Sequence, residues 1–546
     1  MAKTEIAVAE LVWNLIAGRK GNIGRVTYFP QKPAFGYENG CMESSLERST
    51  PESQGISSGH LASFLRELGR TEGTDIHQVL VARHGQVICE CGYGSYPAGL
   101  WHASYSLCKS ITGMAIGMLV QEGALKPTDR VIDFFKKRHL LNVLRQKDIT
   151  VENLLTMTSC VAFNESGILS GDDWVRGFME SGLMGTPGRD FQYNSMNTYL
   201  LSAIVTEVTG ETMMEYLRPR LWEPLGIAKV FWETCPMGIT KGGWGLFLRP
   251  EDAAKLGMLY LQRGKWKDKQ IISEEWAEQS CRKHSTPQPE MGNYGYGYQM
   301  WMAGKEGSFN YNGMLGQNVV VYPDNGLIVV TNAGSRELFQ NCRLMGVVRK
   351  YFEEGFEAQK SLPENPREQA ALYRTIQELG GGQRGPGLIR RGGWRRMQAS
   401  SARKEMWTKQ GGGCGEALCW RGIRFLDGKW YEMQEDSVGL MPLLMQVMHN
   451  NYTDGIRRVG FSARKGRFYL GIQEGEEINW MEIGFSHAVA TDVSFHGEIY
   501  RLGIKGEFSK DEEGRLVLLL DFAFLEEACR RKGRMYFDNN GMEIRW

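Results

Sequence analysis

The chain has 546 residues, of which 42% are hydrophobic and 23% charged, and both fractions are ordinary for a folded protein. At about 100–200 residues per domain, its length predicts roughly two to four domains. The 64 Lys and Arg residues are balanced by 63 Asp and Glu residues, which gives a formal net charge of +1. This balance excludes a globally basic nucleic-acid-binding protein and an acidic disordered one.

The sequence shows no signal for a membrane or for secretion. Its longest apolar runs, such as Leu516–Leu520, are far shorter than the about 18 residues that span a bilayer. Glu5 and Glu10 interrupt the apolar stretch at the N-terminus, and no A-x-A-like cleavage site follows. The 11 cysteines lack both C-x-x-C pairs and the Cys/His spacing of a zinc site. We therefore expect a cytoplasmic protein without a metal ion or cofactor.

A folded unit begins after residues 1–45, which are weakly patterned apart from a helical stretch near Ala7–Ala17. Hydrophobic periodicity predicts helices at Ser58–Arg70, Ser106–Glu122, Val151–Thr158, Asn197–Thr209, Pro250–Arg263, Glu274–Ser280 and Arg336–Glu354. Strands are expected at Gln78–Arg83, Gln86–Cys91, Gly297–Met302, Gln317–Tyr322 and Gly326–Thr331. Thr150 is expected as an N-cap and Gly210 as a helix stop. Strands at both ends with helices between them indicate the α+β class.

A Gly- and Arg-rich segment then breaks the pattern. Residues 380–415 read GGGQRGPGLIRRGGWRRMQASSARKEMWTKQGGGCG, which predicts an exposed linker rather than a nucleic-acid site. Short strands follow, at Lys429–Met433, Val459–Ala463, Arg467–Ile472, Ile478–Ile483, Glu498–Ile504, Leu516–Phe522 and Arg534–Phe537. We expect an N-terminal extension at 1–45, a main domain at 46–365, a basic linker at 366–415 and an antiparallel β accessory domain at 416–546.

Ser106 and Lys109 form the sharpest local signal, in WHASYSLCKSITGMAIGM. A spacing of three on a helix places the hydroxyl and the amine on one face, and the first helical turn favours a developing negative charge. The apolar residues that follow predict a buried helix, in which desolvation lowers the lysine pKa. A neutral amine can take the proton of Ser106 and make it a nucleophile. Alone, the tetrapeptide also occurs on ordinary surface helices.

Further segments surround this motif in a fixed order. They read PESQGIS, then LKPTDRVIDFF, ITVENLLTMTSC, FQYNSMNTYLLSAIVTEVTG, GGWGLFLRPEDAAKLGMLYLQRGKWKDKQIISEEW and GMLGQNVVVYPDNGLIVVTN. Over residues 50–355 the chain resembles the serine hydrolases of the class C β-lactamase and penicillin-binding-protein superfamily, whose first motif is S-x-x-K. Its general form is closest to the carboxylesterase and 6-aminohexanoate-dimer hydrolase branch. The resemblance implies an antiparallel sheet flanked by helices plus an all-helical part.

The resemblance assigns a second motif to Tyr193-Asn194-Ser195. In the family this tyrosine approaches the nucleophile and the lysine, and its phenol holds or relays the proton. A lysine ammonium nearby would lower the pKa of the phenol. Ser195 stands where the family usually has Asn, so the hydrogen bond that an Asn gives to a substrate amide is in question. We expect Tyr193 to be catalytic and Ser195 to contact substrate.

The third motif of the family aligns with Tyr311-Asn312-Gly313, which we expect to bind substrate. The cation that helps β-lactamases and D-Ala carboxypeptidases receive a substrate carboxylate is replaced by Tyr311, which favours neutral esters or amides. Gly313 allows the backbone a close approach. The family implies an oxyanion hole made by the backbone N–H groups of Ser106 and Met314. Weaker candidates for the pocket are His102, Asn164, Glu165, Trp244, Trp301 and Phe309.

The sequence thus predicts a serine hydrolase that cleaves an ester or amide of a small molecule through an acyl-enzyme on Ser106, with Lys109 and Tyr193 moving the proton. A β-lactamase, a D-Ala-D-Ala peptidase or an acyltransferase on the same site remain alternatives. A non-catalytic acyl-binding or scaffold protein is an alternative of another class. We expect a small-molecule partner, neither nucleic acid nor membrane, and the sequence leaves a homo-oligomer open.

Overall fold

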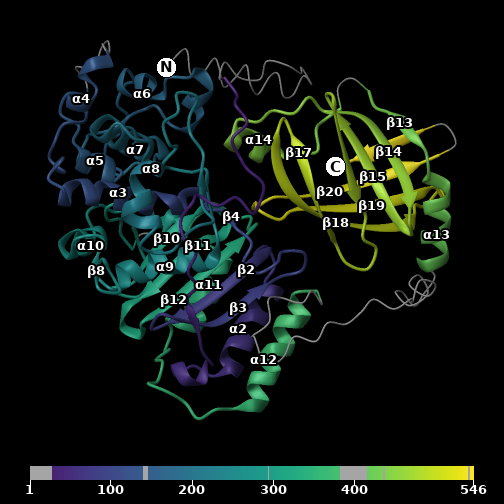
Figure 1. The fold of residues 1–546 in the computed structure, drawn as a ribbon, viewed down its shortest axis with the longest axis horizontal. Helices are drawn as coiled ribbons and strands as arrows, with labels where there is room; N and C mark the ends of the chain where they lie inside the picture. Colours follow the sequence, from purple (N-terminus) through teal and green to yellow (C-terminus); the bar gives the residue numbers. More distant parts are fainter. Residues whose placement is uncertain (1–26, 139–145, 293, 382–414, 435–436, 539–540) are drawn as a thin grey trace.

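The computed structural model describes residues 27–138, 146–292, 294–381, 415–434, 437–538 and 541–546 (Figure 1). Up to residue 379 strands lie near both ends with mostly helices between them, and the C-terminal part is mainly antiparallel strand. The expected α+β class is confirmed. No helix within these ranges is both long and apolar enough to cross a bilayer.

Most helices lie where the hydrophobic periodicity predicts them. Before residue 380 they are α2 (Ser58–Arg70), α3 (Lys109–Gln121), α4 (Val131–Phe134), α5 (Val151–Leu155), α6 (Trp174–Met179), α7 (Ser195–Thr209), α8 (Met213–Leu217), α9 (Pro250–Leu261), α10 (Glu274–Ser280), α11 (Arg343–Phe352) and α12 (Pro366–Leu379). Two expected end signals are confirmed. The hydroxyl of Thr150 accepts from the backbone N–H of Asn153 and caps α5. Gly210 ends α7 in the left-handed region, at φ 77°.

A seven-stranded sheet lies among these helices, with the strand order β1-β3-β2-β12-β11-β10-β9. Its strands are β1 (Glu47–Arg48), β2 (Ile76–Arg83), β3 (Gln86–Gly92), β9 (Trp301–Met302), β10 (Phe309–Gly313), β11 (Gln317–Tyr322) and β12 (Leu327–Ala333). Only β1 and β3 run parallel. Because β2 pairs with β12, opposite ends of the folded unit meet at Val81 and Val329. The expected strand at 297–302 shrinks to β9, and β10 adds a strand that the pattern did not predict.

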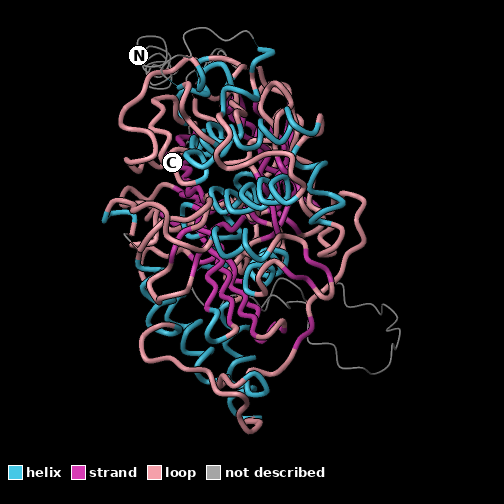
Figure 2. The backbone as a smooth tube through the Cα atoms, turned by 90° about the vertical axis from the view of Figure 1, so that its left-hand side faces the viewer, coloured by secondary structure: helices cyan, strands magenta, loops and turns pink. Residues whose placement is uncertain are grey.

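Both faces of this sheet are covered by helices, and Figure 2 shows its strands running between them. Val79 and Val81 pack with side chains of α2 and α11. Leu80 and Ala82, which alternate with them along β2, pack with side chains of α3 and α9. One face of the sheet therefore packs against α3, the helix that follows Ser106, and holds it in place.

The C-terminal part consists of two antiparallel sheets, β13-β14-β15-β16 and β17-β18-β19-β20-β21. Its elements are α13 (Gly415–Leu426), β13 (Trp430–Glu432), α14 (Leu443–His449), β14 (Ile456–Arg464), β15 (Arg467–Glu474), β16 (Glu477–Glu482), β17 (Val489–Phe495), β18 (Glu498–Lys510), β19 (Leu516–Phe524), β20 (Arg530–Phe537) and β21 (Met542–Arg545). Side chains of both sheets form one apolar core rich in Phe. The expected antiparallel strand region is confirmed, and β17, β21 and the two helices are additional to the seven predicted strands.

The segment expected to be a linker begins with a helix. Asn365 caps α12 and Pro366 starts it, a combination typical of a helix N-terminus. The Glu368 carboxylate accepts from the backbone N–H of Gly59 at 2.8 Å, which ties α12 to α2. The linker expectation is therefore wrong for 366–379, whereas 382–414 and the expected helix near 7–17 lie outside the described residues. The other domain boundaries stay predictions.

Candidate active site

Ser106 lies in a short 3-10 turn, η2 (Tyr105–Cys108), that runs directly into α3. The expected helix from Ser106 thus begins as a tighter turn. Every residue from 101 to 110 is buried except Ser106, which is half-buried. Ser106 is thus the most exposed residue of this segment.

Lys109, the first residue of α3, is 1% exposed and points its amine at Ser106. Its Nζ lies 2.8 Å from the Ser106 Oγ, 2.9 Å from the Ser195 Oγ and 2.8 Å from the carbonyl oxygen of Gly243. None of these groups carries a charge, and among the described residues no carboxylate is within ion-pair distance of the amine. Burial lowers the pKa of Lys109 to about 8, against the opposing charges of Cys108 and Glu165.

The three partners of Lys109 can accommodate both the ammonium and the neutral amine. An NH₂ group has two hydrogens and one lone pair. The carbonyl of Gly243 can only accept, and the Ser195 hydroxyl is placed to accept the second hydrogen. As an ammonium Lys109 also donates to the Ser106 Oγ; once the amine is neutral, its lone pair can face Ser106 and accept the hydroxyl proton. The arrangement is therefore suited to removing the Ser106 proton, as the sequence predicted.

Tyr193 completes the group from the segment just before α7. Its hydroxyl shares a hydrogen bond with Ser106, and the Lys109 amine lies 5.2 Å from the centre of its ring. Burial raises the pKa of Tyr193 above its usual value, although hydrogen bonds from Ser106 and Trp301 oppose the rise. The pKa of Tyr193 thus moves opposite to the lowering expected from a nearby ammonium, because burial of the phenol is the largest effect on it. The phenol therefore stays protonated and is suited to donate.

Ser195 contacts the amine of Lys109, and Glu165 contacts Ser195. Ser195 is the first residue of α7, and its backbone N–H donates to the Glu165 carboxylate at 2.8 Å. Its buried hydroxyl faces Lys109, so the structure places it as a partner of the amine, and a contact with substrate remains a prediction. Glu165 is exposed, and its charge raises the pKa of Lys109. It acts on the site electrostatically, which its place in a polar loop did not indicate.

Gly243 was not singled out in the sequence, yet its carbonyl orients the lysine. A Cβ at Gly243 would lie 2.8 Å from the backbone oxygen of Ser195, and Gly242 adopts φ 68°. The carbonyl of Gly242 accepts from the Thr112 hydroxyl at 2.9 Å. The two glycines let this loop pass between α3 and α7, and the signal that could have found them is the GGWG run itself.

The third motif is placed differently from the expectation. The Tyr311 hydroxyl donates to the carbonyl of Leu256 at 2.8 Å, and the side chain is fully buried. The structure assigns Tyr311 to the core, so it offers no side-chain contact to a substrate. Asn312 is also buried and donates to Asn318 at 2.8 Å. Neither side chain supplies a cation.

Gly313 ends β10 against the turn that carries the nucleophile. A Cβ there would lie 2.3 Å from the Ser104 carbonyl oxygen and 3.1 Å from the Leu107 nitrogen. The close approach expected of Gly313 is therefore made to the Ser106 turn. Met314 follows directly, in a 3-10 turn (Met314–Gly316). An oxyanion hole formed by Ser106 and Met314 stays a prediction.

Of the weaker candidates for the pocket, some lie near Tyr193 and others belong to the core. Trp301 lies against Tyr193, with ring centres 5.4 Å apart. His102 is buried in β4 (His102–Ala103), with its Nε2 3.1 Å from the Nδ1 of His77. Asn164 caps the short helix that begins at Glu165. Trp244 stacks on Trp174 and Phe309 packs beside Tyr311, so both belong to the core.

In the described part of the chain no group of three His, Cys, Asp or Glu residues is arranged to hold a metal ion.

Comparison with known proteins finds relatives of this chain. The 6-aminohexanoate-dimer hydrolase of Paenarthrobacter ureafaciens is 25% identical over 318 residues, which cover 53% of this chain and 80% of that protein. Protein flp of Staphylococcus aureus (strain MW2) is 31% identical over 170 residues, 27% of this chain and 32% of that protein. The octameric penicillin-binding protein homologue from Pyrococcus abyssi is 16% identical, with a TM-score of 0.45 and coverage of 89% of this chain and 99% of that one.

The family model named Beta-lactamase matches residues 61–337, which is half of the chain. This match contains Ser106, Lys109 and Tyr193, the three side chains that the fold brings together around one hydroxyl. The recognition of the family from ordered motifs is thereby confirmed, and the chain belongs to the beta-lactamase family.

Proposed function

We propose that this protein is a serine hydrolase that cleaves an ester or amide of a small molecule through an acyl-enzyme on Ser106. One observation carries the proposal. The buried amine of Lys109 lies 2.8 Å from the Ser106 hydroxyl, has no charged partner in the described part of the chain, and has its pKa lowered to about 8. A neutral amine in contact with a half-exposed hydroxyl is the pairing that activates a serine.

In the first half-reaction Lys109 takes the proton of Ser106 while the Oγ bonds to the substrate carbonyl carbon. The negative charge moves to the carbonyl oxygen, where the backbone N–H groups of Ser106 and Met314 are the proposed donors. Tyr193, which stays protonated, gives its proton to the leaving alcohol or amine as the C–O or C–N bond breaks. The Lys109 ammonium then returns a proton to the phenolate.

In the second half-reaction a water molecule attacks the acyl carbon and loses its proton to Lys109. The bond to the Ser106 Oγ breaks, the acid leaves and the serine regains its proton. An alcohol or amine in place of this water would make the reaction an acyl transfer. The acylation chemistry, and therefore the role of the three side chains, is the same in both cases.

The charges around the site support a neutral substrate. The third-motif position has Tyr311, whose side chain is in the core, so no cation stands there to receive a carboxylate. The nearby exposed charge is the carboxylate of Glu165, which would repel one. These features argue against a dedicated β-lactamase or D-Ala-D-Ala peptidase. The relative named 6-aminohexanoate-dimer hydrolase supports an amide among the candidate substrates.

The test is intact mass spectrometry after treatment with a fluorophosphonate, together with hydrolysis of p-nitrophenyl acetate and butyrate. Ser106→Ala is compared with wild type and with Ser110→Ala, because Ser110 lies on α3 and its hydroxyl bonds instead to the Gln299 carbonyl. We expect one adduct and ester turnover in wild type and Ser110→Ala, and neither in Ser106→Ala. Turnover in purified Ser106→Ala would contradict the proposal, and rapid nitrocefin hydrolysis would favour the β-lactamase alternative.

A further inference from the structure

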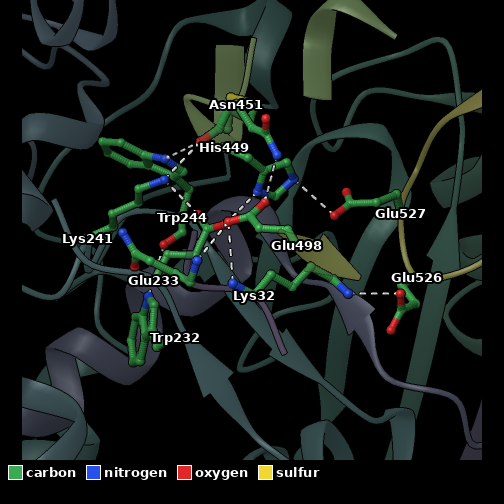
Figure 3. Close-up of polar contacts among 12 residues, drawn as sticks. Lys32, Trp232, Glu233, Lys241, Trp244, His449, Asn451, Glu498, Glu526 and Glu527 are labelled. Carbon is green, nitrogen blue, oxygen red and sulfur yellow. Dashed lines mark hydrogen bonds and ion pairs between the residues drawn. The ribbon is translucent and has the colours of Figure 1, made fainter. Parts of the chain in front are cut away.

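A group of buried charges joins the C-terminal part of the chain to the segments around the active site (Figure 3). We call Glu233, Lys241, His449 and Glu527 the bridge cluster. His449, the last residue of α14, lies between two carboxylates, with Nδ1 2.6 Å from Glu233 and Nε2 3.0 Å from Glu527. The Lys241 amine lies 2.6 Å from the other oxygen of Glu233. All four side chains are at most 4% exposed.

One branch of the cluster reaches the nucleophile. The second oxygen of Glu527 accepts from the Tyr105 hydroxyl at 3.0 Å. Tyr105 directly precedes Ser106 and has φ 46°, a left-handed conformation that bulky residues rarely adopt. Such a conformation persists only where the surroundings hold it. Glu527 therefore fixes the residue whose backbone sets the direction of the Ser106 side chain.

The neighbouring residue of the same β19–β20 turn holds the start of this segment. The backbone N–H of Ala103 donates to the carbonyl of Glu526 at 2.8 Å, and the Trp101 indole donates to the Glu526 carboxylate. Lys32 pairs with that carboxylate at 2.9 Å. The C-terminal turn thus contacts both ends of the five residues that lead to Ser106.

The other branch reaches the base. Lys241 also donates to the carbonyl of Met448 in α14 at 3.0 Å. Its own carbonyl accepts from the backbone N–H of Gly243 at 2.7 Å, and the carbonyl of Gly243 accepts from Lys109 at 2.8 Å. The carbonyl that orients the Lys109 amine is therefore held by a loop whose charged side chain is anchored in the C-terminal part.

The buried charges of the bridge cluster depend on one another as partners. Two carboxylates face two cations, and buried charges need such partners because desolvation of an unpaired one is costly. Burial lowers the pKa of His449, but Glu233 and Glu527 outweigh it and raise the pKa to about 10. The imidazolium is thus present at neutral pH. Removal of one charge leaves another uncompensated, and the backbone segments attached to it are the parts that can move.

We propose that Glu527 and His449 are positioning residues for the acylation of Ser106, through which the C-terminal part sets the geometry of both the nucleophile and its base. Glu527 acts through Tyr105 on Ser106. His449 acts by holding Glu527 and Glu233 in place, and through Glu233 it also holds the loop of Gly243. The inference rests on the proposed function, because it concerns the same serine, and it gives the C-terminal part a role in chemistry.

The test measures the labelling of Ser106 by a fluorophosphonate in the full-length chain, as the maximal rate constant kinact, the half-saturating concentration KI and the final labelled fraction. Tyr105→Phe removes the oxygen that bonds Glu527, and Glu527→Gln removes the charge that faces His449. Tyr322→Phe is the matched control, since its buried hydroxyl donates to the Glu353 carboxylate at 3.1 Å. Thermal melts establish that each variant is folded.

We expect kinact to fall by about 10- to 100-fold in Tyr105→Phe and Glu527→Gln, because small displacements of reacting groups cost this much. KI should stay close to the wild-type value and the control should label as wild type does. Unchanged kinact with a reduced labelled fraction would mean that the contacts only stabilise the fold, and would overturn the inference. Tyr105→Phe loses a single oxygen, so it decides the matter even where Glu527→Gln fails to fold.

The outcome for the proposed function is separate. Normal labelling of Ser106 in both variants refutes the positioning role and leaves the hydrolase proposal standing. Labelling that persists in Ser106→Ala refutes the hydrolase proposal and, with it, the positioning role.

Discussion

Acylation of Ser106 is expected to follow the titration of Lys109. The reactive form is the neutral amine, so the rate rises with pH as the ammonium loses its proton. With a pKa of about 8, the neutral fraction is about 1% at pH 6, about 50% at pH 8 and about 90% at pH 9. The labelling rate constant should therefore rise by about 90-fold between pH 6 and pH 9 and then level off.

Glu165→Gln tests the cause of this profile. The charge of Glu165 raises the pKa of Lys109, whereas burial lowers it. A glutamine keeps an oxygen for the Ser195 N–H but removes the charge, so the midpoint of the profile should move to lower pH. Glu122→Gln is the control, because α3 places it about 20 Å from Lys109 along the helix axis. The assay is kinact for a fluorophosphonate, measured from pH 6 to pH 9.5 in buffers of equal ionic strength.

Two results would refute this reasoning. A rate that does not depend on pH would mean that Lys109 is not the base. A midpoint that stays in place in Glu165→Gln, or moves equally in Glu122→Gln, would mean that the electrostatic environment of the amine is not the one described.

Three further predictions concern single contacts. Tyr193→Phe should lower kcat by about 100-fold for an amide and less for a p-nitrophenyl ester, since nitrophenolate leaves without a proton; parallel steady-state assays measure the ratio. The pKa of His449 is raised from 6.5 to about 10, so the stability it contributes is complete below pH 6.5 and is lost as the pH rises through 10. Urea unfolding of wild type and His449→Gln at pH 7 and pH 9.5 checks this. The difference in unfolding free energy between the two proteins should be smaller at pH 9.5. Gly313→Ala places a methyl group 2.3 Å from the Ser104 carbonyl and should destabilise the fold by about 1–3 kcal/mol and slow Ser106 labelling; a thermal melt and the labelling rate check both.

The parts of the site that the sequence predicts are those set by local spacing. Ser106 and Lys109 meet because three residues separate them at the start of one helix, and Tyr193 joins them where the family order of motifs places it. Gly243 was missed because its role depends on a contact with a lysine far away in the chain. Tyr311 was misplaced because motif alignment fixes the strand but not which of its faces carries the side chain.

The fold, like the site, has segments that the sequence predicts and segments that it does not. Strongly periodic segments such as Ser58–Arg70 were predicted with their bounds, and Gln317–Tyr322 likewise. Composition misled the prediction for Pro366–Leu379, where an Asn-Pro start and an apolar helical stripe were read as part of a linker. The strand at Val489–Phe495 was missed because its ATDVS core alternates without bulky apolar residues, and it is fixed by pairing with β18.

The proposed role of the C-terminal part has no signal in the sequence. His449 ends a short helix and Glu527 lies in the turn between β19 and β20, and neither is part of a recognisable sequence motif. The ion-pair partner Glu233 and the hydrogen-bond partner Tyr105 belong to distant segments, and the packed fold brings them within 3.0 Å. Burial of charge, rather than spacing, is the signal that identifies them.

The central claim is that Ser106 becomes covalently acylated during turnover, and it is tested most directly by trapping that species. The protein is mixed with p-nitrophenyl butyrate, quenched in acid within the first turnovers and digested for peptide mass spectrometry. The account predicts a butyryl group on the peptide that contains Ser106, at a level that falls when Lys109 is replaced by Met. A butyryl group on another residue, or turnover without any acylated peptide, would contradict it.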